Sequence, residues 1–182
     1  MAEEKTEDIN FDAEEEKSAE EEGQEEMSAD DFKGGNYLKT PAVGEELVME
    51  IEKVVKNRNT SGTNSSTGAT FFIGLVDKNK NVRRIDIHAK KGVYTITAWN
   101  IYFKLFDNRA GKEGILINYA KEHKTFAGAK IGIKRNFDGQ HASANVEDLA
   151  KIRSCSVEDA KKYQDEVKKA MKEGTLYTVR LI

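Results

Sequence analysis

The chain has 182 residues, of which 34% are charged, and its formal net charge at pH 7 is −3. This small value combines two opposite halves: residues 1–32 carry 15 acids and two lysines, whereas residues 33–182 carry 27 basic and 17 acidic residues. The single Cys155 excludes an intrachain disulfide, and no apolar run approaches the length of a membrane span, so we expect a soluble protein of the cytoplasm or nucleoid.

The acidic segment opens the chain. Residues 1–35 contain few large apolar side chains, so we expect them to stay disordered, because ordering a backbone costs roughly 1–2 kcal/mol per residue. Gly34-Gly35 is expected to act as a hinge. The rest is long enough for one core, which we divide into a binding domain over 36–145 and a helical extension with a final strand over 146–182. Its positive charge indicates a polyanionic partner.

The first predicted strand follows a period of two. Leu47, Met49 and Ile51 alternate with the side chains between them, as in a strand with one buried face. Val54-Val55 breaks this alternation, which indicates either a bulge or a strand buried on both faces.

Two further strands are predicted before the pattern changes. A polar loop over 57–69 leads to a second strand over 70–76. A turn over 77–81, rich in Asp and Asn, leads to a third strand over 82–89. The first two strands are therefore joined by a long loop and the next two by a short hairpin.

A helix is predicted over 98–106, with Thr97 as its cap. Residues 93–96 are β-branched and aromatic and can extend a strand instead. Within 107–128, residues 115–117 are either a short strand or part of an ordered loop. Four aromatic residues of the helix recur at helical spacing, which is typical of a core face and also compatible with a stacking platform: Trp99, Tyr102, Phe103 and Phe106.

The last third mixes strands and helices. A strand is predicted over 129–137, followed by helices over 146–153 and 157–173. The final segment, 176–182, is predicted to form the last strand. Residues 115–118 remain the alternative position for that fifth strand.

This order of elements is that of a five-stranded OB-like Greek-key barrel with a helix between strands three and four. Three segments resemble OB-fold single-stranded-nucleic-acid-binding proteins of archaeal and phage replication systems: residues 37–39 (Tyr-Leu-Lys), 100–106 (Asn-Ile-Tyr-Phe-Lys-Leu-Phe) and 126–133 (Phe-Ala-Gly-Ala-Lys-Ile-Gly-Ile). The resemblance covers roughly residues 36–137. It implies that the ligand binds on the face of strands two and three.

Basic residues with interleaved aromatic residues are the candidate binding site, because cations follow the phosphates of a single strand while flat rings stack on its bases. We expect most of them on outward strand faces or in adjoining loops. The candidates are Lys56, Arg58, Phe72, Arg84, His88, Lys90, Lys91, Lys130 and Lys134. The alternative is that they are ordinary solvated lysines and core phenylalanines.

No catalytic or cofactor motif is recognisable. The histidines and Cys155 lack the spacing of a metal site, and the glycine-bearing loop at 62–68 lacks the Gly-Lys-Ser/Thr of a phosphate-binding loop. We find no nucleophile with an adjacent base. We therefore expect neither an enzyme nor a cofactor.

The resulting hypothesis is a protein of replication, recombination or repair that binds single-stranded DNA with low sequence specificity. The acidic tail would cover the basic groove until nucleic acid displaces it, and would then recruit replication or repair proteins. An interaction adaptor built on the same barrel and tail is the alternative, and RNA is a further alternative as the ligand. The sequence leaves the oligomeric state open.

Overall fold

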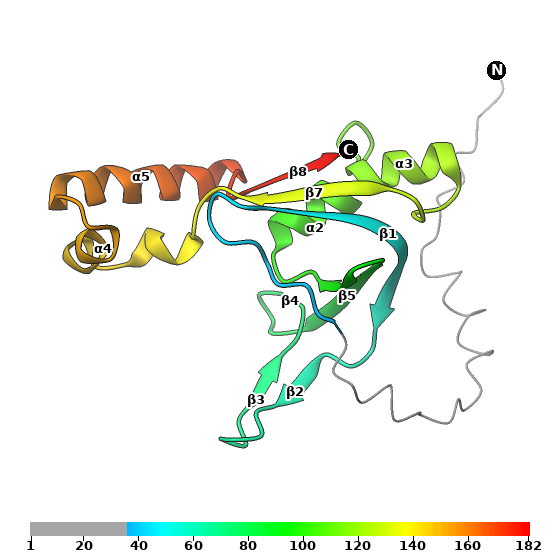
Figure 1. Cartoon of the computed structure of the whole chain (residues 1–182), viewed down its shortest axis with the longest axis horizontal. Helices are drawn as coiled ribbons and strands as arrows, with labels where there is room; N and C mark the ends of the chain where they lie inside the picture. Colours follow the sequence, from blue (N-terminus) through cyan, green and yellow to red (C-terminus); the bar gives the residue numbers. More distant parts are fainter. Residues whose placement is uncertain (1–35) are drawn as a thin grey trace. The chain divides into compact units, whose positions relative to one another are not determined.

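A strongly curled antiparallel sheet organises the computed structural model, which describes residues 36–182 (Figure 1). The expected acidic tail and its glycine hinge, residues 1–35, lie outside the described residues. Along the sheet the strands follow the order β4 (Leu75–Val76), β5 (Val82–Ala89), β1 (Glu46–Asn57), β7 (Lys130–Arg135) and β8 (Tyr177–Leu181), and β6 (Gly92–Thr95) also pairs with β5. The expected β-rich class with C-terminal helices is confirmed at the level of this half-barrel.

The long strand β1 belongs to both halves of the sheet. Its first part, from Glu46 to Glu50, pairs with β7, and its second part, from Ile51 to Asn57, pairs with β5. The register shifts between Ile51 and Lys53, so a bulge lies close to the predicted break at Val54. Because bulges increase local twist, this position helps to curl the sheet. Among the described strands β6 and β8 do not pair, and the half-barrel remains open.

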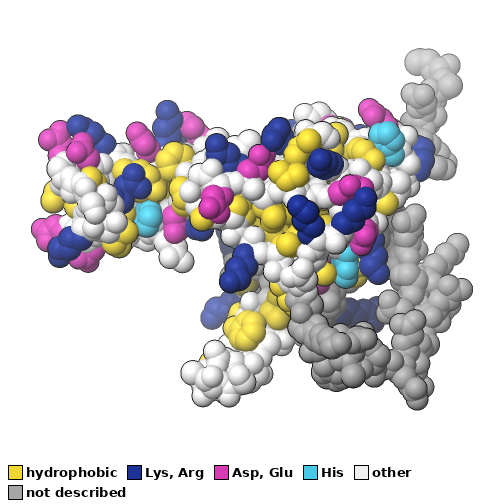
Figure 2. Space-filling view, viewed as in Figure 1, with side chains coloured by type: hydrophobic (Ala, Val, Ile, Leu, Met, Phe, Trp, Pro, Cys, Tyr) yellow, Lys and Arg dark blue, Asp and Glu magenta, His cyan; other side chains and the backbone are white. Residues whose placement is uncertain are grey.

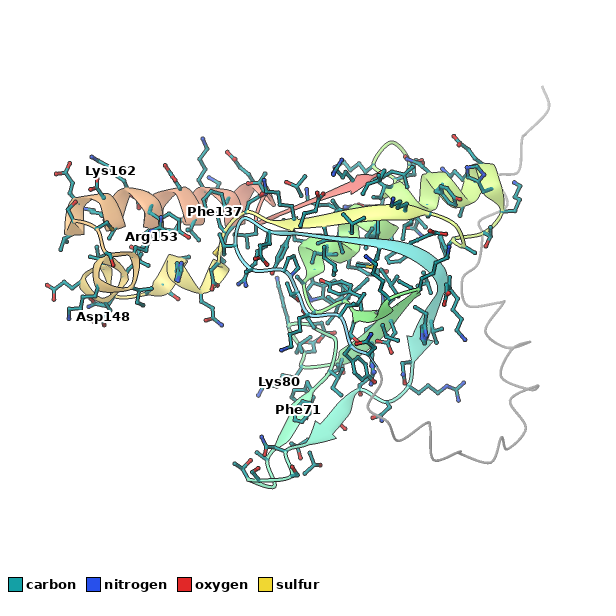
Figure 3. The ribbon with its side chains drawn as sticks, in the orientation of Figure 1. Phe71, Lys80, Phe137, Asp148, Arg153 and Lys162 are labelled. Carbon is teal, nitrogen blue, oxygen red and sulfur yellow. The ribbon has the colours of Figure 1, made fainter. Side chains whose placement is uncertain are left out.

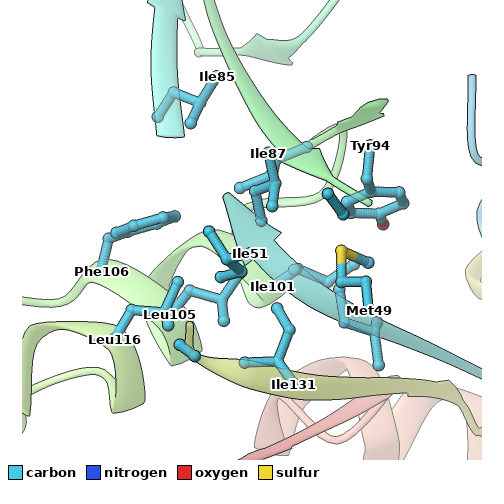
Figure 4. Packing of buried hydrophobic residues seen from close by; sticks show 14 of the residues in the cluster. Met49, Ile51, Ile85, Ile87, Tyr94, Ile101, Leu105, Phe106, Leu116 and Ile131 are labelled. Carbon is cyan, nitrogen blue, oxygen red and sulfur yellow. The ribbon is translucent and has the colours of Figure 1, made fainter. Parts of the chain in front are cut away.

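Side chains from the sheet and from helices α2 (Trp99–Phe106) and α3 (Ile115–His123) fill one core (Figure 4). Ile85, Ile87 and Ile131 point inward as the alternation predicts. Burial raises the pKa of Tyr94, which lies in this core, to about 12. The core also includes Met49, Ile51, Ile101, Leu105, Phe106, Leu116 and Ile133.

The predicted second strand over 70–76 is confirmed only in part, because residues 70–72 and 75–76 form two separate short strands and neither pairs with β1. Its first part is β3 (Thr70–Phe72), which pairs with β2 (Ser61–Thr63), a strand inside the segment expected to be a loop. These two strands form an arm that projects from the sheet in Figure 1. Gly74, with φ +127°, separates β3 from β4, and a Cβ there would lie 2.5 Å from the Arg83 carbonyl oxygen. The strand that pairs with the second part of β1 is therefore β5, and β6 pairs with β5 in turn.

The helix over 98–106 is confirmed as α2, but its cap is Ala98, which makes no side-chain capping bond, in place of the expected Thr97. Residues 115–117 belong to helix α3, so neither the short strand nor the ordered loop is correct. β8 pairs with β7 along its length. This confirms that the last strand lies at the C-terminal end of the sequence, and the alternative position at residues 115–118 is wrong.

A helical hairpin precedes β8 and projects from the sheet in Figure 1. It contains the short helix η1 (Gly139–Ser143), α4 (Val146–Arg153) and α5 (Val157–Glu173). Asn145 and Ser156 cap the two α-helices through bonds from backbone amides to their side chains. A small cluster of its own, with Leu149, Ala150 and Ala160 buried, holds the hairpin together. No helix in the described part of the chain is long and apolar enough to cross a membrane.

Residues 36–38 add a short parallel segment to the free edge of β6. The Leu38 amide donates to the Val93 carbonyl at 2.8 Å, and the Val93 amide donates to the Asn36 carbonyl at 3.0 Å. Gly92 makes this approach possible, since a Cβ at this position would collide with the Asn36 carbonyl. The entry of the chain into the sheet therefore depends on one glycine.

Replacing Gly92 by alanine is expected to detach residues 36–38 from β6. A side chain at φ +147° is strained, and this strain alone costs about 1–3 kcal/mol. The added Cβ would also collide with the backbone carbonyl of Asn36. Hydrogen exchange should show faster exchange of the Leu38 and Val93 amides. Gly111→Ala is the control, because φ there is +74° but the space around it is open. Unchanged protection of both amides in Gly92→Ala would contradict the docking of this segment.

Candidate nucleic-acid interface

One row of side chains crosses the outer face of the half-barrel. Lys53 on β1 lies opposite His88 on β5, His88 lies opposite Val93 on β6, and Val93 bridges to Tyr37. Cross-strand partners share a face. The neighbouring row, which contains Ile87, faces the core. We call Lys53, His88, Val93 and Tyr37 the outer row.

The outer row combines an exposed ring with basic side chains. Tyr37 is 59% exposed, Lys53 is exposed and His88 is half-buried. A ring that is open to solvent beside a lysine and a histidine suits a ligand with both flat bases and phosphates.

Arg84, one of the predicted binding residues, is buried, and its expected outward exposure is wrong. It lies next to the outer row but is only 6% exposed, and Asp86 is 2% exposed. The Arg84 Nε lies 3.1 Å from the Asp86 carboxylate, and the Thr95 hydroxyl donates to the same carboxylate at 2.7 Å. Arg84 therefore has its hydrogen-bond partners inside the protein.

The same network holds the base of the arm. Arg84 Nη1 donates to the Asn59 carbonyl at 3.1 Å, and Asn57 Nδ2 donates to Asp86 at 3.2 Å. The Asn59 amide in turn donates to the Asn57 side chain at 2.9 Å. The structure thus makes Arg84 a positioning residue for the arm that follows β1.

The arm carries two adjacent exposed phenylalanines. Phe71 is 49% exposed and Phe72 is 59% exposed. Phe72 is therefore exposed, as expected for a binding residue on an outward face, and Phe71 beside it is open to solvent as well. Figure 2 shows apolar side chains on the arm with Lys or Arg side chains nearby, and Figure 3 shows Phe71 well away from Arg153 and Lys162 of the helical hairpin.

Four of the predicted basic residues lie at the two ends of β5. Lys56 lies opposite Ile85 near the arm, and Arg58 follows at the arm's base; both are exposed. Lys90 and Lys91 form the turn after β5, where Lys90 pairs with Glu50 at 2.7 Å. Arg84 and Ala89 are five positions apart in β5, and a strand rises about 3.3 Å per residue, so these two positions are roughly 17 Å apart. The outer row lies nearer the second end.

Lys130 and Lys134 lie in the other half of the sheet. Both are exposed on β7, opposite Glu50 and Glu46 of β1. The Arg180 guanidinium donates to both oxygens of Glu46, at 2.7 and 2.9 Å, and lowers the pKa of that carboxyl. This half of the sheet surface therefore mixes both charges, and the structure does not join these two lysines to the outer row.

Tyr37, Lys53 and Phe71 were missed as candidate residues. The alternation that begins at Leu47 places Lys53 inward, but the bulge after Ile51 turns it outward. A lysine in a predicted core position was the available signal. Tyr37 reaches the site only through its bridge to Val93, which no local pattern reveals.

Within residues 36–182 there is no group of three or more His, Cys, Asp or Glu side chains that could hold a metal ion.

Comparisons of the chain with models of protein families, with curated proteins and with solved structures found no match.

Proposed function

We propose that the chain binds single-stranded DNA with low sequence specificity, without enzymatic activity, in replication, recombination or repair. The observation that carries the proposal is the outer row, in which exposed Tyr37 shares a face with Lys53 and His88. The exposed pair Phe71 and Phe72 extends this surface along the arm. Rings stack on bases of any identity, and cations follow the backbone, so such a surface favours low specificity.

The strand order supports an OB-like interpretation of the half-barrel. In this interpretation β1, β5, β6, β7 and β8 are strands one to five, with α2 and α3 between strands three and four. The arm is then an insertion in the loop between strands one and two. OB folds bind oligonucleotides on the face of strands two and three, which here is the face of the outer row.

The acidic tail is proposed to regulate this site. Residues 1–32 carry 15 acids, whereas residues 33–145 carry 19 basic and 10 acidic residues. The tail and a nucleic acid are both polyanions, so they compete for the same basic residues of 33–145. When DNA displaces the tail, its acids become available to replication or repair proteins.

An interaction adaptor is the second candidate, and one observation favours it. The helical hairpin exposes two apolar side chains near its tip, Ile152 at 70% and Val157 at 54%. A protein partner that covers them would use the hairpin and leave the outer row free.

Equilibrium binding of labelled single-stranded DNA, duplex DNA and RNA to the full chain and to residues 33–182 tests these proposals. We expect single-stranded DNA to bind most tightly, with log K falling by roughly 0.7 per phosphate contact against log salt. The truncated chain should bind more tightly at low salt, because it lacks the acidic competitor.

The outcomes separate the alternatives. Preference for RNA would change the ligand and retain the site. Equal affinity of the two chains at low salt would remove the autoinhibition and leave DNA binding intact. If neither chain binds any of the three, nucleic-acid binding is wrong and the adaptor is favoured.

A further inference from the structure

Helix α2 presents one aromatic side chain, Phe103, to solvent, beside the half-buried rings of Trp99 and Tyr102. Ile101 and Leu105 are fully buried and Phe106 is 9% exposed, whereas Phe103 is 47% exposed. Phe103 stacks on Trp99 with ring centroids 5.8 Å apart and an interplanar angle of 29°. The four aromatics are therefore divided between core and surface.

Two arginines flank these rings. Arg109 Cζ lies 5.8 Å from the Phe103 ring centroid, and Arg83 Cζ lies 6.0 Å from the Tyr102 ring centroid. Arg83 also donates to the Tyr102 hydroxyl at 3.3 Å. Trp99 Nε1 donates to the Val76 carbonyl of β4 at 2.8 Å, which fixes the indole. We call Val76, Arg83, Trp99, Tyr102, Phe103 and Arg109 the α2 patch.

The carboxylates near the patch are already engaged. Asp107 accepts from Arg109 at 2.6 Å, and hydrogen bonds from Arg109 lower the pKa of Asp107 to about 2. Asp77 accepts bonds from Asn79 and Asn81. Asp107 therefore holds the Arg109 guanidinium against the ring, so that less freedom is lost when a ligand contacts it.

The α2 patch is separate from the outer row but adjacent to the arm. Arg83 and Arg84 are neighbours in β5, and because strand side chains alternate, they point to opposite faces. β4 follows the arm directly: Val76 is four positions after Phe72, a span of at most about 14 Å. The arm is thus connected to the outer face of the sheet through Asn59 and Arg84, and to the α2 patch through β4.

We propose that the α2 patch is a second contact site for single-stranded nucleic acid, with Phe103 as a base-stacking ring and Arg83 and Arg109 as phosphate contacts. The inference rests on the proposed function, which it deepens by giving the bound strand a path across both faces. Cations beside an exposed ring suit a ligand that carries both phosphates and bases. Because Trp, Tyr and Arg are also enriched at protein interfaces, a protein partner is the alternative outcome of the test.

Trp99 makes the test direct, because it is the only tryptophan in the chain. Its emission reports on the α2 patch, while the anisotropy of a labelled oligo(dT) reports binding anywhere on the protein. The experiment uses the full chain and the variants Phe103→Leu, which removes the ring, and Phe103→Tyr, which keeps it. Ile152→Ala, an exposed apolar residue of the helical hairpin, is the matched control.

Oligo(dT) is expected to change the Trp99 emission of the wild-type chain, and Phe103→Leu is expected to weaken affinity about five- to 150-fold. Phe103→Tyr and Ile152→Ala should bind like the wild type. Thermal unfolding of each variant verifies that it folds.

Failure of the α2 patch differs from failure of the proposed function. If oligo(dT) binds by anisotropy but Phe103→Leu binds equally well, the α2 patch is overturned and the outer row remains. A patch built for a protein partner gives this same result. If wild-type anisotropy and Trp99 emission both stay unchanged, both proposals are overturned.

Discussion

Replacing Arg84 by alanine is expected to lower the free energy of unfolding by about 3–5 kcal/mol, because it leaves the Asp86 carboxylate, which is 2% exposed, without its cationic partner. The Asn59 carbonyl also loses its donor at the base of the arm. Urea denaturation followed by circular dichroism measures the loss. Hydrogen exchange should in addition show a more mobile arm.

Two comparisons make this result specific. Arg84→Lys keeps the charge, but a single ammonium cannot reproduce the fork that reaches Asp86 and Asn59, so an intermediate loss is expected. Lys162→Ala breaks the exposed pair with Glu158 and should have little effect. A loss below about 1 kcal/mol for Arg84→Ala would contradict the structural role of the network.

Replacing both Phe71 and Phe72 by alanine is expected to weaken binding of single-stranded DNA by at least about thirtyfold. Each base stacked on a ring contributes about 1–3 kcal/mol, and these two rings are about half exposed in the free protein. Equilibrium binding of a labelled oligonucleotide measures the change. Stability should shift by less than about 1 kcal/mol, because neither ring belongs to the core.

The control for the double variant removes an equal number of exposed apolar side chains elsewhere. Ile152 and Val157 near the tip of the helical hairpin serve this purpose, and their replacement by alanine should leave DNA affinity unchanged. If the two double variants lose affinity equally, a general effect of surface hydrophobicity explains the result, and the arm has no special role.

Elements with strong periodicity could be predicted from the sequence. β1, β5, β7, α2 and α5 all show the expected spacing of apolar side chains, because each buries one face against the same core or its own cluster. The arm could not be predicted in this way. β2 is a Ser-Gly-Thr segment without apolar alternation, and it is a strand only because β3 pairs with it.

The candidate site was predicted less well than the fold, because the exposure of its side chains depends on contacts with residues that are distant in the sequence. Alternation gives Arg84 the face opposite to Ile85, but whether that face is open depends on Asn59 and Tyr37, which lie far away in the chain. Phe103 shows the converse. Its helical spacing is typical of a core residue, yet it is the aromatic residue of α2 that the fold leaves most open to solvent.

The hydrogen bonds that hold residue 36 against β6 fix the point at which the preceding segment is attached. That point is one residue from Tyr37 of the outer row. Any competition by the acids of residues 1–32 is therefore intramolecular, and its strength is set by an effective concentration that the tether determines. Dilution of the protein does not weaken such an inhibitor, whereas the same acidic peptide added in trans must reach that concentration to act.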